Sequence, residues 1–223
     1  MFAIVIYDFC LKKLFLIRDR VGIKPLYVLM EENRVAFSSE IKSFKALPDF
    51  KFEIDTSCLD EFLLFRNLIN DTLYKGITNC TPGTYIEISN DGQIKQVVYY
   101  SINQENSIPY AGDVKNRLSQ ILSRSVERQM ISDVKLGCQL SGGVDSSLIT
   151  YYANQTLESG QLETVSIVFD NPKYNEKQYI DKVASQLHLK SHQFRMDADT
   201  YFDIIDNVSW HFENPINHPN TIG

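Results

Sequence analysis

The stretch SGGVDSS at residues 141–147 decides the fold class of this 223-residue chain. It follows a strand-like run, residues 135–140, and precedes a helix-like run, residues 148–154. A strand that enters a Gly-Gly turn and leaves as a helix points several backbone N–H groups, and the positive end of the helix, at one place. The sequence therefore predicts an anion site there, and phosphate is the anion that suits it.

The side chains of the same loop extend this prediction. The hydroxyl groups of Ser141, Ser146 and Ser147 can donate hydrogen bonds, whereas the Asp145 carboxylate would repel a phosphate unless a cation lay between them. Asp145 therefore predicts Mg²⁺. The plainer alternative is a Ser/Gly turn that only caps a helix, because these residue types are ordinary cap residues. Their order between a strand and a helix favours the phosphate site.

Composition narrows the class of protein. The net charge is −6, the pI is near 5.2 and the longest basic run is Lys12-Lys13, so no nucleic-acid partner is expected. The four cysteines are irregularly spaced, which favours reduced thiols. The apolar start, Met1–Ile17, is interrupted by charges and lacks a cleavage site, so neither a signal peptide nor a membrane span is expected. We expect a cytoplasmic protein.

The sequence divides into two regions with different expected secondary structure. Residues 1–100 are expected to be β-rich, with short helices at Glu40–Leu47 and Leu59–Arg66. The strands expected there are Phe2–Tyr7, Leu14–Arg18, Leu26–Met30, Val35–Ser38, Thr84–Ser89 and Gln96–Tyr100. Residues 101–112 have the composition of a linker.

Residues 113–223 are predicted to alternate helix and strand, which indicates α/β architecture with a parallel sheet. A helix of about sixteen residues begins near Val114, and the strand Glu163–Phe169 follows the loop helix. Ligands of such sheets bind at the carboxyl ends of the strands, where Ser141 falls.

The loop resembles the pyrophosphate loop of ATP-pyrophosphatases, which split ATP into AMP and pyrophosphate. Further blocks resemble the glutamine-hydrolysing asparagine synthetases in the same order: residues 18–27 (RDRVGIKPLY), 37–42 (FSSEIK), the Pro82-Gly83 pair, and residues 166–176. The resemblance implies the C-terminal part of an N-terminal-nucleophile-type, β-rich glutaminase domain at residues 1–100. A linker at 101–112 and an incomplete parallel-sheet ATP-pyrophosphatase domain at 113–223 would follow.

This family adenylates the side-chain carboxylate of aspartate with ATP and amidates it with ammonia from glutamine. The implied partners are thus small molecules (aspartate, glutamine and ATP) together with Mg²⁺, with a homodimer left open. The residues implied to hold ATP and its pyrophosphate are Leu140, Ser141, Gly142, Gly143, Asp145, Ser146, Ser147 and Ile167. Asp145 would hold the metal, and Leu140 and Ile167 would contact adenine, although plain core burial explains those two equally well.

Other matched positions have structural interpretations. Glu176 matches an acidic position near the substrate, but a charge at a helix N-terminus explains it as well. Arg18, Asp19 and Lys24 are expected to form an ion-paired loop near the domain interface.

The sequence also departs from the family. The family's nucleophilic cysteine stands at the mature N-terminus, whereas residue 2 here is Phe2 and Met1 matches a point already deep inside that domain. Cys10 is expected in a turn, and Glu213-Asn214 replaces an acidic pair. No catalytic glutaminase residue is therefore expected, and the chain is interpreted as a fragment truncated at both ends and inactive alone. Two alternatives remain. One is a related enzyme that amidates another carboxylate, and the other is an inactive nucleotide-binding remnant.

Overall fold

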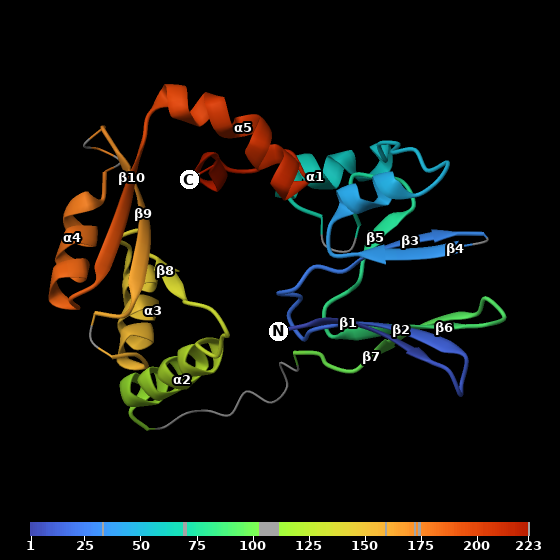
Figure 1. Ribbon diagram of the computed structural model, residues 1–223, viewed down its shortest axis with the longest axis horizontal. Helices are drawn as coiled ribbons and strands as arrows, with labels where there is room; N and C mark the ends of the chain where they lie inside the picture. Colours follow the sequence, from blue (N-terminus) through green and yellow to red (C-terminus); the bar gives the residue numbers. More distant parts are fainter. Residues whose placement is uncertain are drawn as a thin grey trace. The chain divides into compact units, whose positions relative to one another are not determined.

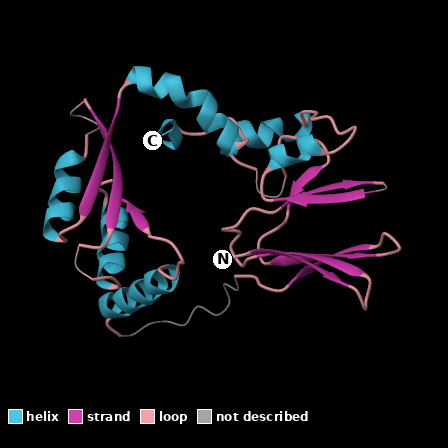
Figure 2. Cartoon of the chain, in the orientation of Figure 1, coloured by secondary structure: helices cyan, strands magenta, loops and turns pink. Residues whose placement is uncertain are grey.

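The computed structural model describes residues 1–32, 34–68, 71–102, 112–158, 160–171, 173 and 175–222. Its contacts divide the chain into two compact units. The first unit comprises Met1–Ser107 together with Asn207–His218, and the second comprises Ile108–Asp206 together with Pro219–Gly223. Figures 1 and 2 show that the first unit holds antiparallel strands, whereas helices flank the strands of the second.

The first unit contains a four-stranded antiparallel sheet in the order β1-β2-β6-β7. Its strands are β1 (Ala3–Asp8), β2 (Lys13–Arg18), β6 (Thr84–Ser89) and β7 (Ile94–Val98). The turn between β1 and β2 is fixed by Asp8, whose carboxylate accepts the backbone N–H groups of Cys10 and Leu11 at 2.8 Å each. Strand β1 lies at the sheet edge and is mostly exposed.

A second antiparallel sheet, in the order β4-β3-β5, faces the first. Its strands are β3 (Tyr27–Glu31), β4 (Arg34–Ser38) and β5 (Ile77–Asn79). Side chains of β3 point alternately to two cores, as the two-residue period of a strand requires. Val28 packs with Leu16 and Ile86 of the first sheet, while Leu29 packs with Ile77 and with the 3₁₀ helix η1 (Ile41–Ala46). A short 3₁₀ turn, η2 (Thr56–Cys58), leads into α1 (Leu59–Phe65).

Arg18 and Asp19 hold the chain where it leaves β2. The buried Asp19 carboxylate accepts backbone N–H groups of Phe2, Val21, Ile23 and Lys24 at 2.9–3.2 Å. The Arg18 guanidinium donates to the backbone oxygens of Gly22, Lys24 and Cys80 and to the Asn79 side chain. The expected ion-paired loop is therefore wrong in kind: these charges pair with backbone groups, and no ion pair of Arg18 or Asp19 occurs among the described residues.

The second unit is built on a parallel sheet in the order β10-β9-β8. Its strands are β8 (Gly137–Gln139), β9 (Glu163–Phe169) and β10 (Lys190–Met196), and its helices are α2 (Val114–Gln129), α3 (Val144–Gln155) and α4 (Lys177–Gln186). A core of Val126, Tyr152, Ala153 and Leu162 joins α2, α3 and the start of β9. Helix α5 (Ala198–Phe212) follows β10, and the short turn η4 (Pro219–Ile222) comes last.

The predicted α/β class with a parallel sheet is confirmed. The secondary structure differs from the predicted one in four places. The strand expected at 135–140 is only β8, the helix after the loop begins at Val144 rather than at residue 148, and the helix expected at Glu40–Leu47 is a 3₁₀ helix. Strand β5 was not anticipated. The expected linker falls mainly on 103–111, outside the described residues, and the domain boundaries stay a prediction.

In the part of the chain that the structure covers, no helix is both long enough and apolar enough to cross a bilayer.

Asp19→Asn should destabilise the first unit in a pH-dependent way. Burial alone would raise the pKa of Asp19, but the four backbone donors outweigh it and lower that pKa from 3.8 to about 2. The carboxylate therefore contributes about 2 kcal/mol above pH 4, which is lost as the pH falls towards 2. We expect that loss at pH 7 in urea unfolding followed by Trp210 fluorescence, with a smaller difference at pH 2. Asp91→Asn, in an exposed hairpin, is the control, and equal effects of both variants would contradict the prediction.

Candidate phosphate-binding site

The loop 141–147 leaves the sheet at the carboxyl end of β8 and becomes helix α3. The backbone N–H of Leu140 donates to the carbonyl of Val165 at 2.9 Å, which extends the pairing of β8 with β9 up to the loop. The loop thus begins at a rigid, buried point, because Leu140 is 1% exposed. This placement agrees with the sequence-based expectation that the site lies at the carboxyl edge of the sheet.

The backbone conformation and close packing at residue 142 require a glycine, whether or not a ligand binds. Its φ of +89° is a left-handed conformation, and an added Cβ would lie 3.1 Å from the carbonyl oxygen of Glu176 and 3.3 Å from Ile180. Those neighbours belong to the N-terminal end of α4 and its first turn. The close approach therefore brings the N-terminal ends of α3 and α4 together at the loop, and both ends carry partial positive charge.

Gly143 has a different role, because nothing in the protein requires a glycine there. Its φ is −70°, and an added Cβ would only touch the Ser141 hydroxyl at 3.5 Å, an ordinary contact. Gly143 is the N-cap of α3, and no side chain caps the helix in its place. The first N–H groups of a helix have no partner within the helix. Space without a Cβ beside such groups is what a bound anion needs.

The serine hydroxyls of the loop bond to one another and to Gly143. The Ser147 hydroxyl donates to the Gly143 carbonyl at 2.7 Å, and the Ser146 hydroxyl lies 3.2 Å from that carbonyl and 2.9 Å from the Ser141 hydroxyl. A hydroxyl rotates easily and is both donor and acceptor. These groups can hold the loop in shape and turn towards a ligand.

Asp145 lies exposed in the first turn of α3, because the helix begins earlier than the sequence predicted. No cluster of three or more acidic, histidine or cysteine side chains suited to a metal occurs in the described ranges. A single carboxylate fits Mg²⁺ only when substrate phosphates and water complete the coordination, which is the usual arrangement for this ion. The residues present therefore fit a Mg²⁺ that arrives with a phosphate ligand.

Of the two expected adenine contacts, Leu140 directly follows β8 and Ile167 lies on the neighbouring strand β9. Leu140 is buried, so its side chain belongs to the core and its backbone is the part left to contact a base. Ile167 is half-buried on β9. A cavity of about 410 Å³ opens at the carboxyl ends of β9 and β10 between Phe169, Met196 and Tyr201, and neither Leu140 nor Ile167 lines it.

The sequence analysis did not predict three buried hydroxyl side chains in α3 and β9. Thr150 of α3 and Thr164 and Ser166 of β9 are at most 3% exposed, and their hydroxyl oxygens have no hydrogen-bond partner. The run 163–169 reads as continuously apolar, so its alternating hydroxyls gave no clear signal. The close contact of Glu176 with Gly142 also escaped, since it joins residues far apart in sequence. Glu176 itself is exposed and is the N-cap of α4, which agrees with its structural interpretation.

Two family models match this chain, one in each half. Residues 1–101 match the glutamine amidotransferase domain, and residues 117–223 match the asparagine synthase family. The resemblance to the glutamine-hydrolysing asparagine synthetases is therefore confirmed. The asparagine synthase match includes the whole candidate loop.

Individual proteins that resemble this chain include glutamine-hydrolysing asparagine synthetases. Glutamine-hydrolysing asparagine synthetase 1 of Bacillus subtilis is 29% identical over 223 residues, which are all of this chain and 35% of that protein. Asparagine synthetase 3 of the same organism is 34% identical over 179 residues, or 78% of this chain and 29% of the relative. Amidase chry2 of Gibberella zeae is 22% identical over 252 residues, covering 100% of this chain and 35% of the relative. This chain thus spans about a third of the length of these relatives.

One solved structure aligns weakly. A glutamine-dependent NAD⁺ synthetase from Acinetobacter baumannii, in complex with ADP, aligns with 96% of this chain and 53% of its own, at 11% identity. The TM-score of 0.35 is too low to support any inference about fold or ligand.

Alanine at Gly142 should destabilise the second unit, whereas alanine at Gly143 should have little effect on its stability. Gly142→Ala is expected to lower the free energy of unfolding of the second unit by about 1–3 kcal/mol, because of its positive φ and close neighbours. Gly143→Ala should stay within about 1 kcal/mol. Urea unfolding followed by far-ultraviolet circular dichroism measures both, since α2, α3 and α4 lie in that unit. Equal destabilisation by the two variants would show that Gly143 is also a structural glycine.

Proposed function

We propose that residues 141–147 bind the pyrophosphate part of ATP in a glutamine-dependent asparagine synthetase. In this proposal ATP adenylates the side-chain carboxylate of aspartate, and ammonia released from glutamine converts the adenylate into asparagine. The proposal concerns the whole enzyme, of which the chain spans about a third when measured by its relatives.

The observation that carries the proposal is the uncapped N-terminus of α3 beside Gly143. In α2 a side-chain oxygen serves the first amides, because Asp113 accepts the N–H of Asn116 at 3.1 Å. Helices α1 and α4 start without a side-chain cap, as α3 does, but their cap residues are Cys58 and Glu176. Only at α3 among these four helices is the cap position a glycine that the fold does not need, which leaves space for a ligand beside the amides.

The chemistry requires activation of a carboxylate. A carboxylate oxygen of the acceptor attacks the α-phosphorus of ATP, the bond to the β-phosphate oxygen breaks, and pyrophosphate leaves. Ammonia then attacks the acyl carbon, and AMP departs with the original carboxylate oxygen. In the first step the chain's own groups hold the pyrophosphate: the amides at the start of α3, the hydroxyls of Ser141, Ser146 and Ser147, and the partial charge of two helix ends. Asp145 would hold a Mg²⁺ that neutralises the phosphate charge.

The acceptor acid is the least supported part of the proposal. The loop contacts only the ATP side of the reaction, so any carboxylate could be activated by the same residues. A relative named as an amidase matches the whole chain at 22% identity, beside the proteins named asparagine synthetases. A related enzyme acting on another carboxylate is therefore the second candidate, and an inactive nucleotide-binding form is the third.

Binding of pyrophosphate to this chain tests the loop directly. We expect Mg²⁺-dependent binding of pyrophosphate and ATP in calorimetric titrations. Gly143→Ala should weaken it at least about tenfold because the added Cβ would occupy the space beside the first amides of α3. Asp145→Asn should weaken it by a similar factor through the loss of one charged contact. Asp199→Asn, an exposed carboxylate in the first turn of α5, is the control and should bind normally. Unchanged binding in both loop variants would reduce the loop to a helix start without a ligand.

The acceptor is tested in the extended enzyme by ATP–pyrophosphate exchange with a panel of carboxylic acids. Exchange should depend on aspartate and be abolished by Asp145→Ala. Activity with another acid but not with aspartate would support the second candidate, and no exchange with any acid would support the third.

A further inference from the structure

Residues 207–218 belong to one half of the chain by sequence and to the other by contact. The asparagine synthase match covers them, yet they group with the first unit, whose remaining residues fall mainly in the amidotransferase match. The segment, here called the returning segment, contains the last turns of α5 and the residues that follow. Specific side-chain contacts hold the returning segment against elements that are far away in the sequence.

Glu213 makes the best-defined contact of the returning segment. Its carboxylate oxygens accept the backbone N–H groups of Ile41 and Lys42, at 2.7 and 2.5 Å. These are the first two amides of η1, where no side chain of the neighbouring sequence serves as a cap. The side chain of Glu213 is only 8% exposed, and its charge is met by the Lys42 ammonium at 3.7 Å. Hydrogen bonds that join a carboxylate to backbone amides are among the stronger ones in proteins.

The backbone at Glu213 is unusual in a way that supports a specific role. Its φ is +57°, a left-handed conformation that favours glycine or asparagine, although its own N–H still closes the last turn of α5 on Ser209 at 2.9 Å. Glycine at this position would relieve the backbone but remove the carboxylate. A glutamate in this strained conformation makes contacts to η1 that a glycine could not make, which indicates that its side chain has a structural role there.

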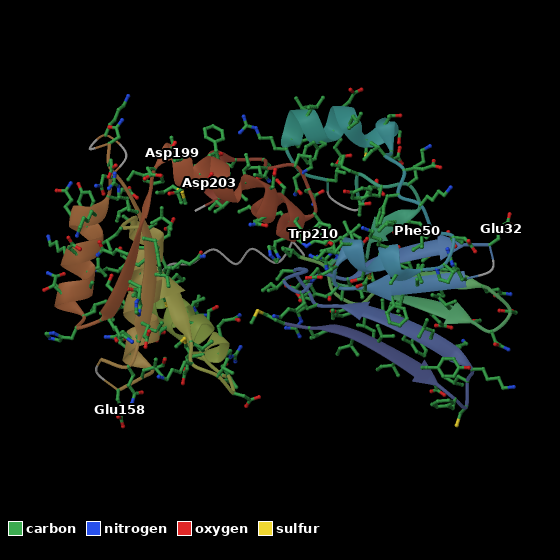
Figure 3. The ribbon with its side chains drawn as sticks, turned by 45° about the horizontal axis from the view of Figure 1, so that its top comes forward. Glu32, Phe50, Glu158, Asp199, Asp203 and Trp210 are labelled. Atoms are coloured by element: carbon green, nitrogen blue, oxygen red, sulfur yellow. The ribbon has the colours of Figure 1, made fainter. Side chains whose placement is uncertain are left out.

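Contacts on both sides of Glu213 add to the attachment. Lys42 lies 5.6 Å from the ring centre of Trp210, which Figure 3 labels, and can donate to the Trp210 carbonyl at 3.5 Å. Farther along, Asn217 and Arg66 exchange two side-chain-to-backbone hydrogen bonds, at 3.2 and 3.4 Å. Arg66 ends α1, so the returning segment contacts η1 at one place and α1 at another.

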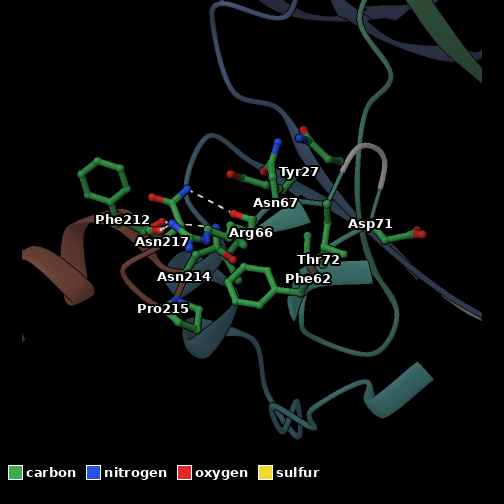
Figure 4. Close-up of a pocket in the computed structure, with 13 residues that line it drawn as sticks. Tyr27, Phe62, Arg66, Asn67, Asp71, Thr72, Phe212, Asn214, Pro215 and Asn217 are labelled. Atoms are coloured by element: carbon green, nitrogen blue, oxygen red, sulfur yellow. Dashed lines mark hydrogen bonds between the residues drawn. The ribbon is translucent and has the colours of Figure 1, made fainter. Parts of the chain in front are cut away.

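Between these contacts lies a cavity of about 200 Å³ (Figure 4). Phe212, Asn214 and Pro215 of the returning segment line one part of it, and residues of the amidotransferase match, including Tyr27 and Thr72, line the rest. Glu213 does not line the cavity. It lies between two lining residues and turns its side chain to η1 instead, so it acts on the cavity only through the path of the chain.

We propose that Glu213 is a positioning residue that locks the returning segment onto η1 and so closes this cavity with residues from both halves of the chain. The carboxylate is needed because one oxygen must accept each amide, and the amide nitrogen of a glutamine cannot. The inference goes beyond the proposed reaction and does not depend on which acid is activated.

The test compares two carboxylates that both contact Lys42. Glu213→Gln keeps the size of the side chain but loses one acceptor and the charge. Glu40→Gln removes the other carboxylate near Lys42, 3.3 Å away and half exposed, which accepts neither η1 amide. Trp210 is the chain's single tryptophan, so its fluorescence reports directly on the returning segment.

In Glu213→Gln we expect a red shift of Trp210 emission, stronger quenching by acrylamide, and amide hydrogen exchange at Ile41 and Lys42 faster by roughly 10- to 100-fold. Exchange in β2 and β6, which belong to the same unit as Glu213, should be unchanged, which shows that this unit of the variant is folded. Glu40→Gln should resemble the unmodified chain in all three measurements. The proposal is overturned if Glu213→Gln keeps the emission and the exchange rates, or if Glu40→Gln changes them equally. Neither outcome depends on nucleotide binding, so failure of the proposed function would be separately visible.

Discussion

Buried backbone amides need hydrogen-bond partners, and in this chain charged side chains supply them at the points where the fold turns. Asp19 accepts four backbone N–H groups beyond β2, Arg18 donates to three backbone oxygens, and Glu213 accepts the first two amides of η1. The charges of Asp19 and Arg18 are compensated by peptide dipoles, and that of Glu213 by two backbone amides together with the Lys42 ammonium. The start of α3 has no side-chain cap, which is also true of α1 and α4, but at α3 the cap residue is a glycine that the fold does not require. That glycine is the strongest reason to place a ligand there.

Much of the fold could be predicted because its signals are local. Strand and helix periodicity in residues 113–223 gave the parallel sheet, and the Gly-Gly turn gave the position of the loop. The details that failed depend on tertiary context. Strand β8 is short because only three residues pair with β9, and η1 is a 3₁₀ helix whose first amides are bound from 171 and 172 residues away. Periodicity carries no information on such distant partners.

In the candidate site, too, the local features were predicted and those that depend on tertiary contacts were not. Sequence alone selected residues 141–147 but gave Gly142 and Gly143 the same role. The structure separates them: Gly142 is needed for its positive φ and for contact with α4, whereas Gly143 is free of both demands. Leu140 and Ile167 could not be separated from core residues, because apolar side chains that contact a base and those that pack inside are chemically alike. Arg18, Asp19 and Lys24 were expected to form an ion-paired loop. The turn after β2 instead offers backbone donors to Asp19 and backbone acceptors to Arg18, and the sequence does not show where such groups lie.

The distance in sequence between Glu213 and η1 has a consequence for synthesis of the protein. A ribosome makes Ile41 and Lys42 long before it makes Glu213, and domains otherwise tend to fold as units from the N-terminus. The sheets of the first unit can pair early, since their partners are all made by residue 98. The start of η1 and one part of the cavity wall must wait for more than a hundred further residues. During that interval water is the partner of those amides, and the nascent amidotransferase half remains open on the side that the returning segment later covers.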